Sequence, residues 1–359
     1  MIAYTLMLGI IFGISVIINN GTKMDRKKKN RLILKLGILL IWGMCALKKE
    51  TVGIDIAGYK RIYEQSAYWP WFSFSNVYFE EGYTLLMQLF SKNGISFQVF
   101  NAFVYALIYF PWYLFLKRYS QMPTLSLLIY ICYQFWVFNM SGLRQGIAMS
   151  MCLLSFVLLE KKSLLRTLLF IFIVLIASTI HRSAVVFLIA LGTYLAKVNI
   201  KMLSIFALCF VMSMVFREHI VSFVNSFAGI YQVSAHMELG GSFIMLCGFT
   251  IYIIYTNWGR KYTGECINTI ARMNTDASTY MMLCSIALNL LLNGSNLLRG
   301  ASYASMFLTI SLPAASIKYE WKSRLILCST IGIFLLALFY NDVLFANQLN
   351  IIPYKFFWQ

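Results

Sequence analysis

Long runs of apolar residues, separated by short polar segments, follow one another along the whole chain. The clearest of them cover residues 2–18, 32–47, 97–116, 163–180 and 325–340. A helix of roughly 17–25 apolar residues crosses a hydrocarbon core about 30 Å thick and keeps its backbone hydrogen bonds within itself. The pattern therefore predicts an all-α polytopic membrane helical bundle of about twelve transmembrane spans.

Three apolar runs are shorter or weaker than the others. They cover residues 83–90, 146–159 and 280–292, and each is interpreted as a re-entrant segment or a half-helix. The chain shows no internal repeat, low-complexity tract or soluble domain. Residues 1–359 are therefore expected to form a single integral membrane domain.

Composition excludes a soluble globular fold. Hydrophobic residues make up 60% of the chain, charged residues make up 12%, and the mean hydropathy is +0.72. A water-soluble domain cannot hide that much apolar surface. The eight cysteines form no C-x-x-C pair, so neither a disulfide framework nor a zinc site is expected.

The formal net charge of +17 reflects a membrane topology. A basic cluster, KMDRKKKNR at residues 23–31, follows the first apolar run, which is interpreted as an uncleaved helix because no basic segment precedes it. Most other Lys and Arg residues fall on the side of this cluster, so the positive-inside rule puts it in the cytoplasm and the N-terminus outside. Because the charge is spread over many short loops, no nucleic-acid partner is expected.

The longest loop on the predicted outer side, residues 49–79, is rich in aromatic residues. Asp55, Tyr59 and Tyr63 are spaced four apart, which puts them on one face if the segment is helical. One interpretation is an interfacial helix whose tyrosines and tryptophans form an aromatic belt. The other is a sugar site, since aromatic rings stack on pyranose faces and carboxylates accept hydroxyl protons. The two interpretations are compatible.

Two adjacent carboxylates, Glu80 and Glu81, lie where this loop meets the next apolar run. Carboxylates at a membrane boundary are costly to desolvate unless they face a wet cavity or a cation. The alternative is an ordinary acidic helix N-terminus, which the helix dipole favours.

Three arginines interrupt apolar runs on the predicted outer face. Ser141 is a candidate N-cap, and Arg144 follows it at a helix start, where a cation opposes the helix dipole unless an anion neutralises it. His181 and Arg182 occupy a very short connection, and Arg299 lies in a third interruption. Guanidinium groups form forked hydrogen bonds to phosphate oxygens, so the set predicts a site for a multivalent anion such as a diphosphate. A snorkelling Arg144 and a structural hydrogen bond of His181 are the alternatives.

Together these segments resemble the EpsG family of bacterial exopolysaccharide polymerases, which is related to the Wzy-type polymerases of O-antigen and capsule. The resemblance runs in order through Gly53-x-Asp55 with Tyr59 and Tyr63, Glu80-x-Gly82-Tyr83, Ser141-Gly142-Leu143-Arg144-Gln145, His181-Arg182-Ser183-Ala184, Arg299 with Tyr303, and Ile352-Pro353-Tyr354. It covers nearly the whole chain. Where the family often has Pro between Glu and Gly, this chain has Glu81, so either Glu80 or Glu81 matches the functional carboxylate.

The resemblance implies a GT-C-like glycosyltransferase on the outer face of the bacterial cytoplasmic membrane. The growing chain would move from undecaprenyl diphosphate to the terminal hydroxyl of an incoming lipid-linked repeat unit. On this hypothesis the diphosphate is stabilised, without a metal or other cofactor, by Arg144, Arg182 and Arg299. The leading general base is His181, because histidine titrates near neutral pH, and its rivals are Glu80, Glu81 and Asp55. The expected sugar-binding residues are Tyr59, Tyr63, Tyr83, Gln145 and Tyr303.

Other functions compete for the same features. A lipid-linked oligosaccharide flippase or transporter binds phosphate too, although such proteins more often show repeated halves and charges at the membrane midplane. An O-antigen ligase shares the need for arginine and histidine, whereas an acyltransferase leaves the arginines unexplained. The partners that the resemblance implies are undecaprenyl-diphosphate-linked glycans, membrane lipid, a flippase and a chain-length regulator.

Overall fold

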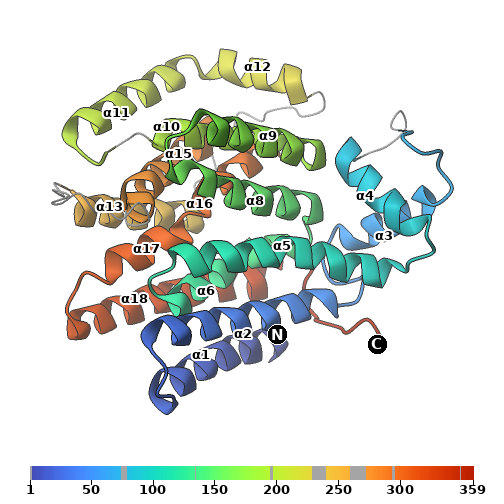
Figure 1. Ribbon diagram of the computed structural model, residues 1–359, viewed down its shortest axis with the longest axis horizontal. Coiled ribbons are helices and arrows are strands. Elements are labelled where there is room, and N and C mark those ends of the chain that lie inside the picture. The colour runs from blue at the N-terminus through green and yellow to red at the C-terminus, as the bar shows by residue number, and fades with distance from the viewer. Residues whose placement is uncertain are drawn as a thin grey trace.

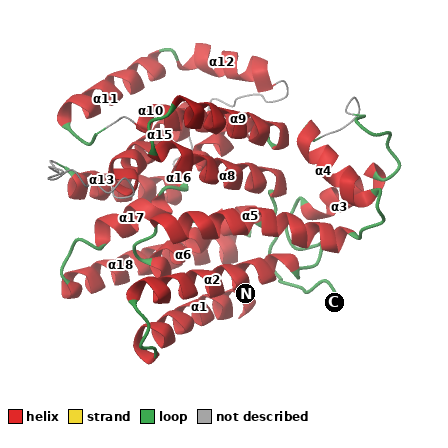
Figure 2. Cartoon of the chain, viewed as in Figure 1, coloured by secondary structure: helices red, strands yellow, loops and turns green. Residues whose placement is uncertain are grey.

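The computed structural model describes residues 2–73, 79–133, 135–194, 197–228, 240–258, 272–292, 296–347 and 349–359. In this part of the chain the regular elements are all helical, and the only β-type contact is an isolated bridge between Lys48 and Phe356 (Figure 2). The all-α prediction is therefore confirmed. Two pieces of the predicted outer segments, residues 74–78 and 293–295, lie outside the described residues.

Most of the helices run side by side in a layered bundle (Figure 1). In chain order the α-helices are α1 (Ile2–Gly21), α2 (Arg26–Ala46), α3 (Ile56–Ser66), α4 (Glu81–Ser91), α5 (Phe97–Tyr119), α6 (Pro123–Cys132), α7 (Phe135–Asn139), α8 (Leu143–Phe156), α9 (Leu164–Ile180), α10 (Ala190–Tyr194), α11 (Ile200–Val215), α12 (Arg217–Ala228), α13 (Gly241–Asn257), α15 (Ser278–Leu291), α16 (Ser302–Ser305), α17 (Leu308–Ser316) and α18 (Trp321–Tyr340). Short 3₁₀ or π segments extend or connect them: η1 (Val157–Glu160), η2 (Arg182–Ile189), η3 (Met273–Ala277), η4 (Asn296–Ala301) and η5 (Asn341–Ala346).

Within the described residues, four helices are long and apolar enough to cross a membrane: Ile2–Gly21, Phe97–Tyr119, Leu143–Glu160 and Trp321–Val343. Five further apolar helices have 10–17 residues: Pro123–Cys132, Leu164–Ile180, Arg182–Thr193, Ile200–Val215 and Gly241–Asn257. The count of about twelve spans and the GT-C-like arrangement stay predictions. The run 146–159, interpreted from the sequence as a re-entrant segment or a half-helix, instead belongs to an 18-residue helix because η1 prolongs α8.

The packing of α8 against α5 shows how the bundle is held together. A Cβ atom at Gly146 of α8 would lie 2.8 Å from Ile108 Cδ1 and 2.9 Å from Asn139 Oδ1, so glycine lets these two side chains pack directly against the α8 backbone. One turn later, the Ser150 hydroxyl donates to the Ile108 carbonyl oxygen over 2.9 Å. Small residues and cross-helix hydrogen bonds are how helices associate in lipid, where burial of apolar surface gives little advantage. The contact fixes the position from which the start of α8 presents its side chains.

The α3–α4 pair projects beyond the ends of α1 and α2 (Figure 1). The segment that leads into it pairs with the C-terminal segment, where the Gly53 N–H donates to the Asn350 carbonyl oxygen over 3.0 Å. Gly53 has φ of +106°, and a Cβ atom there would lie 2.8 Å from the Met140 carbonyl oxygen. Only glycine accepts both the backbone angle and the close approach. This contact brings the start of α3 against the turn that precedes α8.

Candidate functional site

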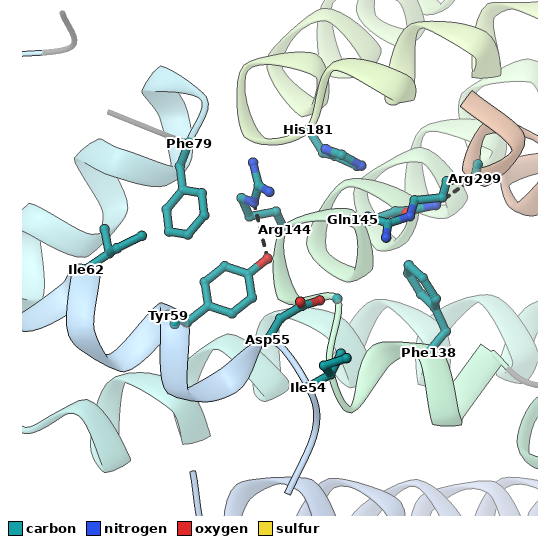
Figure 3. A pocket seen from close by; sticks show the side chains of 12 residues that line it. Ile54, Asp55, Tyr59, Ile62, Phe79, Phe138, Arg144, Gln145, His181 and Arg299 are labelled. Carbon is teal, nitrogen blue, oxygen red and sulfur yellow. Dashed lines mark hydrogen bonds between the residues drawn. The ribbon is translucent and has the colours of Figure 1, made fainter. Parts of the chain in front are cut away.

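A cavity of about 290 Å³ lies where α3, the start of α8, the α9–η2 connection and η4 come together. Figure 3 shows the side chains around it. The lining residues are Ile54, Asp55, Gly58, Tyr59, Ile62, Phe79, Phe138, Gly142, Arg144, Gln145, His181 and Arg299. The folded chain thus brings together, from four distant segments, these residues singled out in the sequence: Asp55, Tyr59, Arg144, Gln145, His181 and Arg299.

Arg144 lies in the first turn of α8, between an aromatic wall and a carboxylate. Its guanidinium forms an ion pair with Glu80 Oε2. Its Nε donates to the Tyr59 hydroxyl over 3.2 Å, and its Cζ lies 4.3 Å from the centroid of the Phe79 ring. The anion that a cation at a helix start requires is therefore supplied by Glu80. Since an arginine over an aromatic face is held in orientation as well as in charge, the guanidinium is preorganised.

The cap of α8 differs from the sequence interpretation. Gly142 occupies the N-cap position without a side-chain cap, so the assignment of Ser141 as N-cap is wrong. The Ser141 hydroxyl donates to Asp55 Oδ2 over 3.2 Å and accepts the Asp55 backbone N–H over 3.1 Å. Ser141 thus helps to orient Asp55, which is exposed and lines the cavity.

Glu80 and His181 form a hydrogen-bonded pair across the α4–α9 contact. His181 Nδ1 lies 2.9 Å from Glu80 Oε1, and the backbone N–H of Arg182 donates to the same oxygen over 3.2 Å. A carboxylate bound at Nδ1 favours the tautomer with the proton on Nδ1, which leaves Nε2 free to accept a proton. Glu81, by contrast, is exposed in the first turn of α4. Of the two adjacent carboxylates, Glu80 is the one in the cluster.

The surroundings of Glu80 keep it ionised. Burial by itself raises the pKa of this carboxyl, but the hydrogen bond from His181 and the positive charge of Arg144 outweigh it and lower the pKa to about 2. The same arginine acts on Tyr59, whose pKa is raised by burial and lowered in part by the Arg144 charge. At neutral pH the cluster therefore holds a carboxylate anion between an arginine and a histidine.

Arg299 lies on the opposite side of the cavity. Its guanidinium carbon lies 5.8 Å from the centroid of the Phe138 ring, and its backbone carbonyl oxygen accepts a hydrogen bond from Gln145 Nε2 over 2.8 Å (Figure 3). Among the residues that the structure describes, no carboxylate forms an ion pair with Arg299. Gln145 therefore holds the backbone of η4 while the Arg299 charge remains available to an anion in the cavity.

Arg182 occupies a different position from the other two arginines. Its backbone N–H contacts Glu80, but its side chain is exposed and does not line the cavity. His181 has an extended backbone, in which neighbouring side chains point to opposite sides, so His181 faces the cavity and Arg182 faces away from it. The cavity is lined by Arg144 and Arg299.

Three of the tyrosines expected to bind sugar lie behind the cavity wall. Tyr63 donates its hydroxyl to the Ile95 carbonyl oxygen over 2.7 Å, and Tyr83 packs edge-on against Tyr59 at 5.6 Å between ring centroids. Tyr303 is fully buried and accepts a hydrogen bond from the Ser183 hydroxyl over 3.3 Å. None of the three is a lining residue, and Tyr83 supports the lining residues Tyr59 and Phe79 from behind.

The apolar lining residues Phe79 and Phe138 were not singled out in the sequence. Phe79 stacks on Tyr59 with 5.0 Å between ring centroids, and Phe138 lies under Arg299. The sequence offers one indication of these two residues, their closeness to candidate site residues: Phe79 precedes Glu80, and Phe138 lies three residues before Ser141. In a chain with 29 phenylalanines, that signal does not distinguish a lining ring from a lipid-facing one.

No group of three His, Cys, Asp or Glu side chains in the described chain is placed to share a metal ion. The prediction of metal independence stays a prediction.

Comparison with known families gives a match to the EpsG family over residues 31–356. No curated protein and no solved structure matches the chain. The matched range contains every cavity-lining residue, from Ile54 to Arg299.

Proposed function

Because the chain belongs to the EpsG family, we propose that it is a membrane-embedded glycosyltransferase that polymerises undecaprenyl-diphosphate-linked oligosaccharide repeat units. Family membership and the apolar helices indicate a membrane-bound polysaccharide polymerase of exopolysaccharide biosynthesis. The proposal adds the lipid diphosphate donor and places the reaction on the outer face of the bacterial cytoplasmic membrane. The proposed product is exopolysaccharide, and capsule and O-antigen are the alternative product classes.

The observation that carries the proposal is the cavity shared by Arg144, His181 and Arg299. Transfer of a glycan from a diphosphate needs positive charge for the leaving group, a base for the acceptor hydroxyl and a place for both sugars. The two guanidinium groups supply the charge, and the His181–Glu80 pair supplies the base. Asp55 and the Tyr59–Phe79 ring pair supply groups that bind sugar hydroxyls and sugar faces.

The reaction step follows from these roles. The bond between the anomeric carbon of the donor sugar and the diphosphate oxygen breaks, and the acceptor hydroxyl oxygen forms the new bond to that carbon. The hydroxyl proton passes to His181 Nε2, because Nδ1 already carries a proton and donates it in a hydrogen bond to Glu80. The bonding electrons leave on undecaprenyl diphosphate, whose oxygens accept hydrogen bonds from Arg299 and Arg144. Glu80 stays ionised throughout and stabilises the imidazolium, as the carboxylate of a catalytic triad does.

Purified protein in detergent, supplied with a synthetic polyprenyl-diphosphate repeat unit, tests the proposal. The expected product is a ladder of oligosaccharides, lost in His181→Ala by a factor on the order of 10²–10⁴. Intact lipid transport without a ladder would favour a flippase instead. A product extended by a single transfer would favour a ligase.

A further inference from the structure

The turn 67–73, between α3 and the segment that precedes α4, displays aromatic rings to solvent. Tyr68 is 90% exposed, Phe72 is 67% exposed and Trp71 is 48% exposed. The turn lies beyond the ends of α1 and α2, on the side of the α3–α4 pair farthest from the bundle (Figure 1). Aromatic belts lie at the level where spanning helices end. The turn therefore displays these rings past the level at which α1 and α2 end.

Side chains of α4 and of its C-cap residue, Lys92, hold this turn in place. Gln88 Nε2 donates to the Pro70 carbonyl oxygen over 3.0 Å, and Lys92 Nζ donates to the carbonyl oxygens of Ala67 and Trp69. The same ammonium lies 5.1 Å from the centroid of the Trp71 ring. Three carbonyl groups of one short turn are thus fixed to a neighbouring helix. The rings therefore project from a backbone that hydrogen bonds hold in place.

Phe72 adopts a backbone conformation that its side chain disfavours. Its φ is +59°, in the left-handed region that bulky residues rarely enter. Such strain persists where the surroundings impose it, and it gathers at binding sites. Burial does not compensate here, because the ring is mostly exposed. What the conformation achieves is to turn the Phe72 ring outward beside Trp71, at 6.4 Å between ring centroids.

We propose that the turn 67–73 is a binding platform for the growing polysaccharide, on which sugar faces stack against Tyr68, Trp71 and Phe72. The inference rests on the proposed function. Helix α3 connects the cavity to the turn. Tyr59 of α3 lines the cavity, and the turn begins after Ser66, the last residue of α3, so the two are separated by a rise of about 10 Å along the helix. A polymer made in the cavity passes this turn as it extends into water. Aromatic rings bind it by stacking, which tolerates different sugars.

A second contact on the polymer changes processivity. While the platform holds the chain, its reactive end stays near the cavity at a raised effective concentration, so more transfers follow before the polymer dissociates. Loss of the rings shortens the products without slowing a single transfer, because none of the three rings lines the cavity.

The experiment compares wild type with Trp71→Ala, Phe72→Asn and the variant that combines them. Asparagine suits a left-handed backbone, so Phe72→Asn removes the ring without adding strain. Trp358→Ala is the matched control, since that tryptophan is 61% exposed in the C-terminal segment. The readouts are the ladder length, the rate of one transfer, and the affinity for oligosaccharides of one and of several repeat units, released by mild acid from the host's own polysaccharide.

The combined variant is expected to make a ladder with markedly shorter products and to bind the long oligosaccharide at least about tenfold more weakly, a loss of roughly 1.4 kcal/mol. The rate of one transfer and the affinity for one repeat unit stay at the wild-type level, and the control matches wild type in every readout. Unchanged ladder length and unchanged affinity for the long oligosaccharide would refute the binding platform and leave the proposed function standing. Quenching of Trp71 fluorescence by brominated lipid would also refute the binding platform, by identifying a membrane anchor. A wild-type protein that makes no ladder would overturn the proposed function.

Discussion

At the scale of single residues, two neighbouring carboxylates have opposite surroundings. Glu80 accepts from His181 and pairs with Arg144, whereas Glu81 faces solvent one position later. The difference arises because Glu80 is the N-cap residue of α4 with extended backbone angles, while Glu81 begins the helix. One step along the chain therefore separates a group that orients the base from an ordinary acidic first turn.

Glu80→Gln is expected to lower turnover by at least about 10². A neutral amide is a weaker acceptor for the Nδ1 proton than a carboxylate, and it can also donate to Nδ1, so the tautomer of His181 is no longer fixed. Glu81→Gln, the matched control, should stay within about twofold of wild type, since an exposed charge at a helix start contributes little. The initial rate of ladder formation is the measurement. Equal losses in both variants would refute the distinction.

The three arginines also separate at this scale. Arg144→Ala and Arg299→Ala are each expected to lower kcat/KM for the lipid diphosphate donor by about 10²–10³, because each removes preorganised charge from the cavity. Arg182→Ala should cost less than about tenfold, since its exposed side chain does not line the cavity. Kinetics at varied donor concentration test the order, and protein abundance in the membrane controls for folding. A larger loss in Arg182→Ala than in Arg299→Ala would move the diphosphate to the other side of His181.

Lys48 is expected to make the free energy of unfolding depend on pH. The side chain is fully buried and its ammonium donates to the Val52 carbonyl oxygen, with no described carboxylate in ion-pair distance. Burial lowers the pKa of Lys48 from 10.5 to about 7, against weaker opposing effects of Cys45 and Glu50. Because the folded pKa lies below the unfolded one, the unfolded chain binds the extra proton between these values. Stability therefore rises with pH from about 7 to 10.5 and is lost as pH falls toward 7.

Lys48→Met should remove this dependence, which is at most about 1.4 kcal/mol per pH unit for one proton. Methionine keeps a flexible side chain in the space and brings no charge. The midpoint of thermal unfolding in detergent, followed by fluorescence across that pH range, is the measurement. An identical slope in both proteins would mean that Lys48 is not the titrating group.

At the scale of helices, the contact between α4 and α9 sets the distance between Glu80 and His181. A Cβ atom at Gly82 would lie 2.4 Å from Thr179 Oγ1 and 2.9 Å from the Thr179 carbonyl oxygen. The backbone atom cannot move aside as a flexible side chain can. Gly82 therefore lets the two helices meet closely enough for the carboxylate to reach the imidazole.

Gly82→Ala is expected to separate the helices, destabilise the protein by about 1–3 kcal/mol and abolish most of the turnover. Gly192→Ala in α10 is the matched control, because nothing lies within 4 Å of a Cβ atom built there. Alanine is also the better helix former, so the control should be neutral or slightly stabilising. Turnover and the thermal midpoint together report the result. Full turnover in Gly82→Ala would show that this approach does not position Glu80.

The hydrophobic pattern predicts helices well and their ends poorly. Apolar runs commit a segment to a helix, since lipid leaves the backbone no other partner, and so α1, α5 and α18 agree with the sequence. Ends depend on local hydrogen bonds that a pattern does not contain. Ser141 has the chemistry of an N-cap, but its hydroxyl bonds Asp55 instead. The run 146–159 is too short for a full span by itself, but the helix that contains it extends from Leu143 to Glu160.

The same reasoning applies to the site. Charged residues at apolar boundaries stand out in a sequence, so Arg144, His181 and Arg299 could be selected before the fold was known. Which way each side chain points depends on packing between helices, and the sequence treats Arg182 as the equal of its neighbours. Aromatic lining residues give no contrast against an apolar chain. Phe138 is recognisable only once Arg299 is seen above its ring.

At the scale of the whole molecule, the cavity and the basic cluster lie at opposite ends of the bundle. The 21 residues of α2 begin within the cluster 23–31 and end next to Lys48, a rise of about 31 Å, close to the thickness of a hydrocarbon core. Figure 1 shows the α1–α2 turn and the α3–α4 pair on opposite sides. If the positive-inside rule keeps the cluster in the cytoplasm, the cavity opens outside, where lipid-linked repeat units are expected.

Labelling of introduced cysteines tests this orientation. In intact cells a membrane-impermeant maleimide should label Glu64→Cys on exposed α3 and leave Lys28→Cys unlabelled until the membrane is opened. The parent protein gives the background, to which exposed Cys209 contributes. The reverse pattern would place the cavity in the cytoplasm, where repeat units have not yet crossed the membrane. Since the arginines would then face the side of lipid-linked precursor assembly, that result would refute outer-face polymerisation even if every cavity variant lost activity.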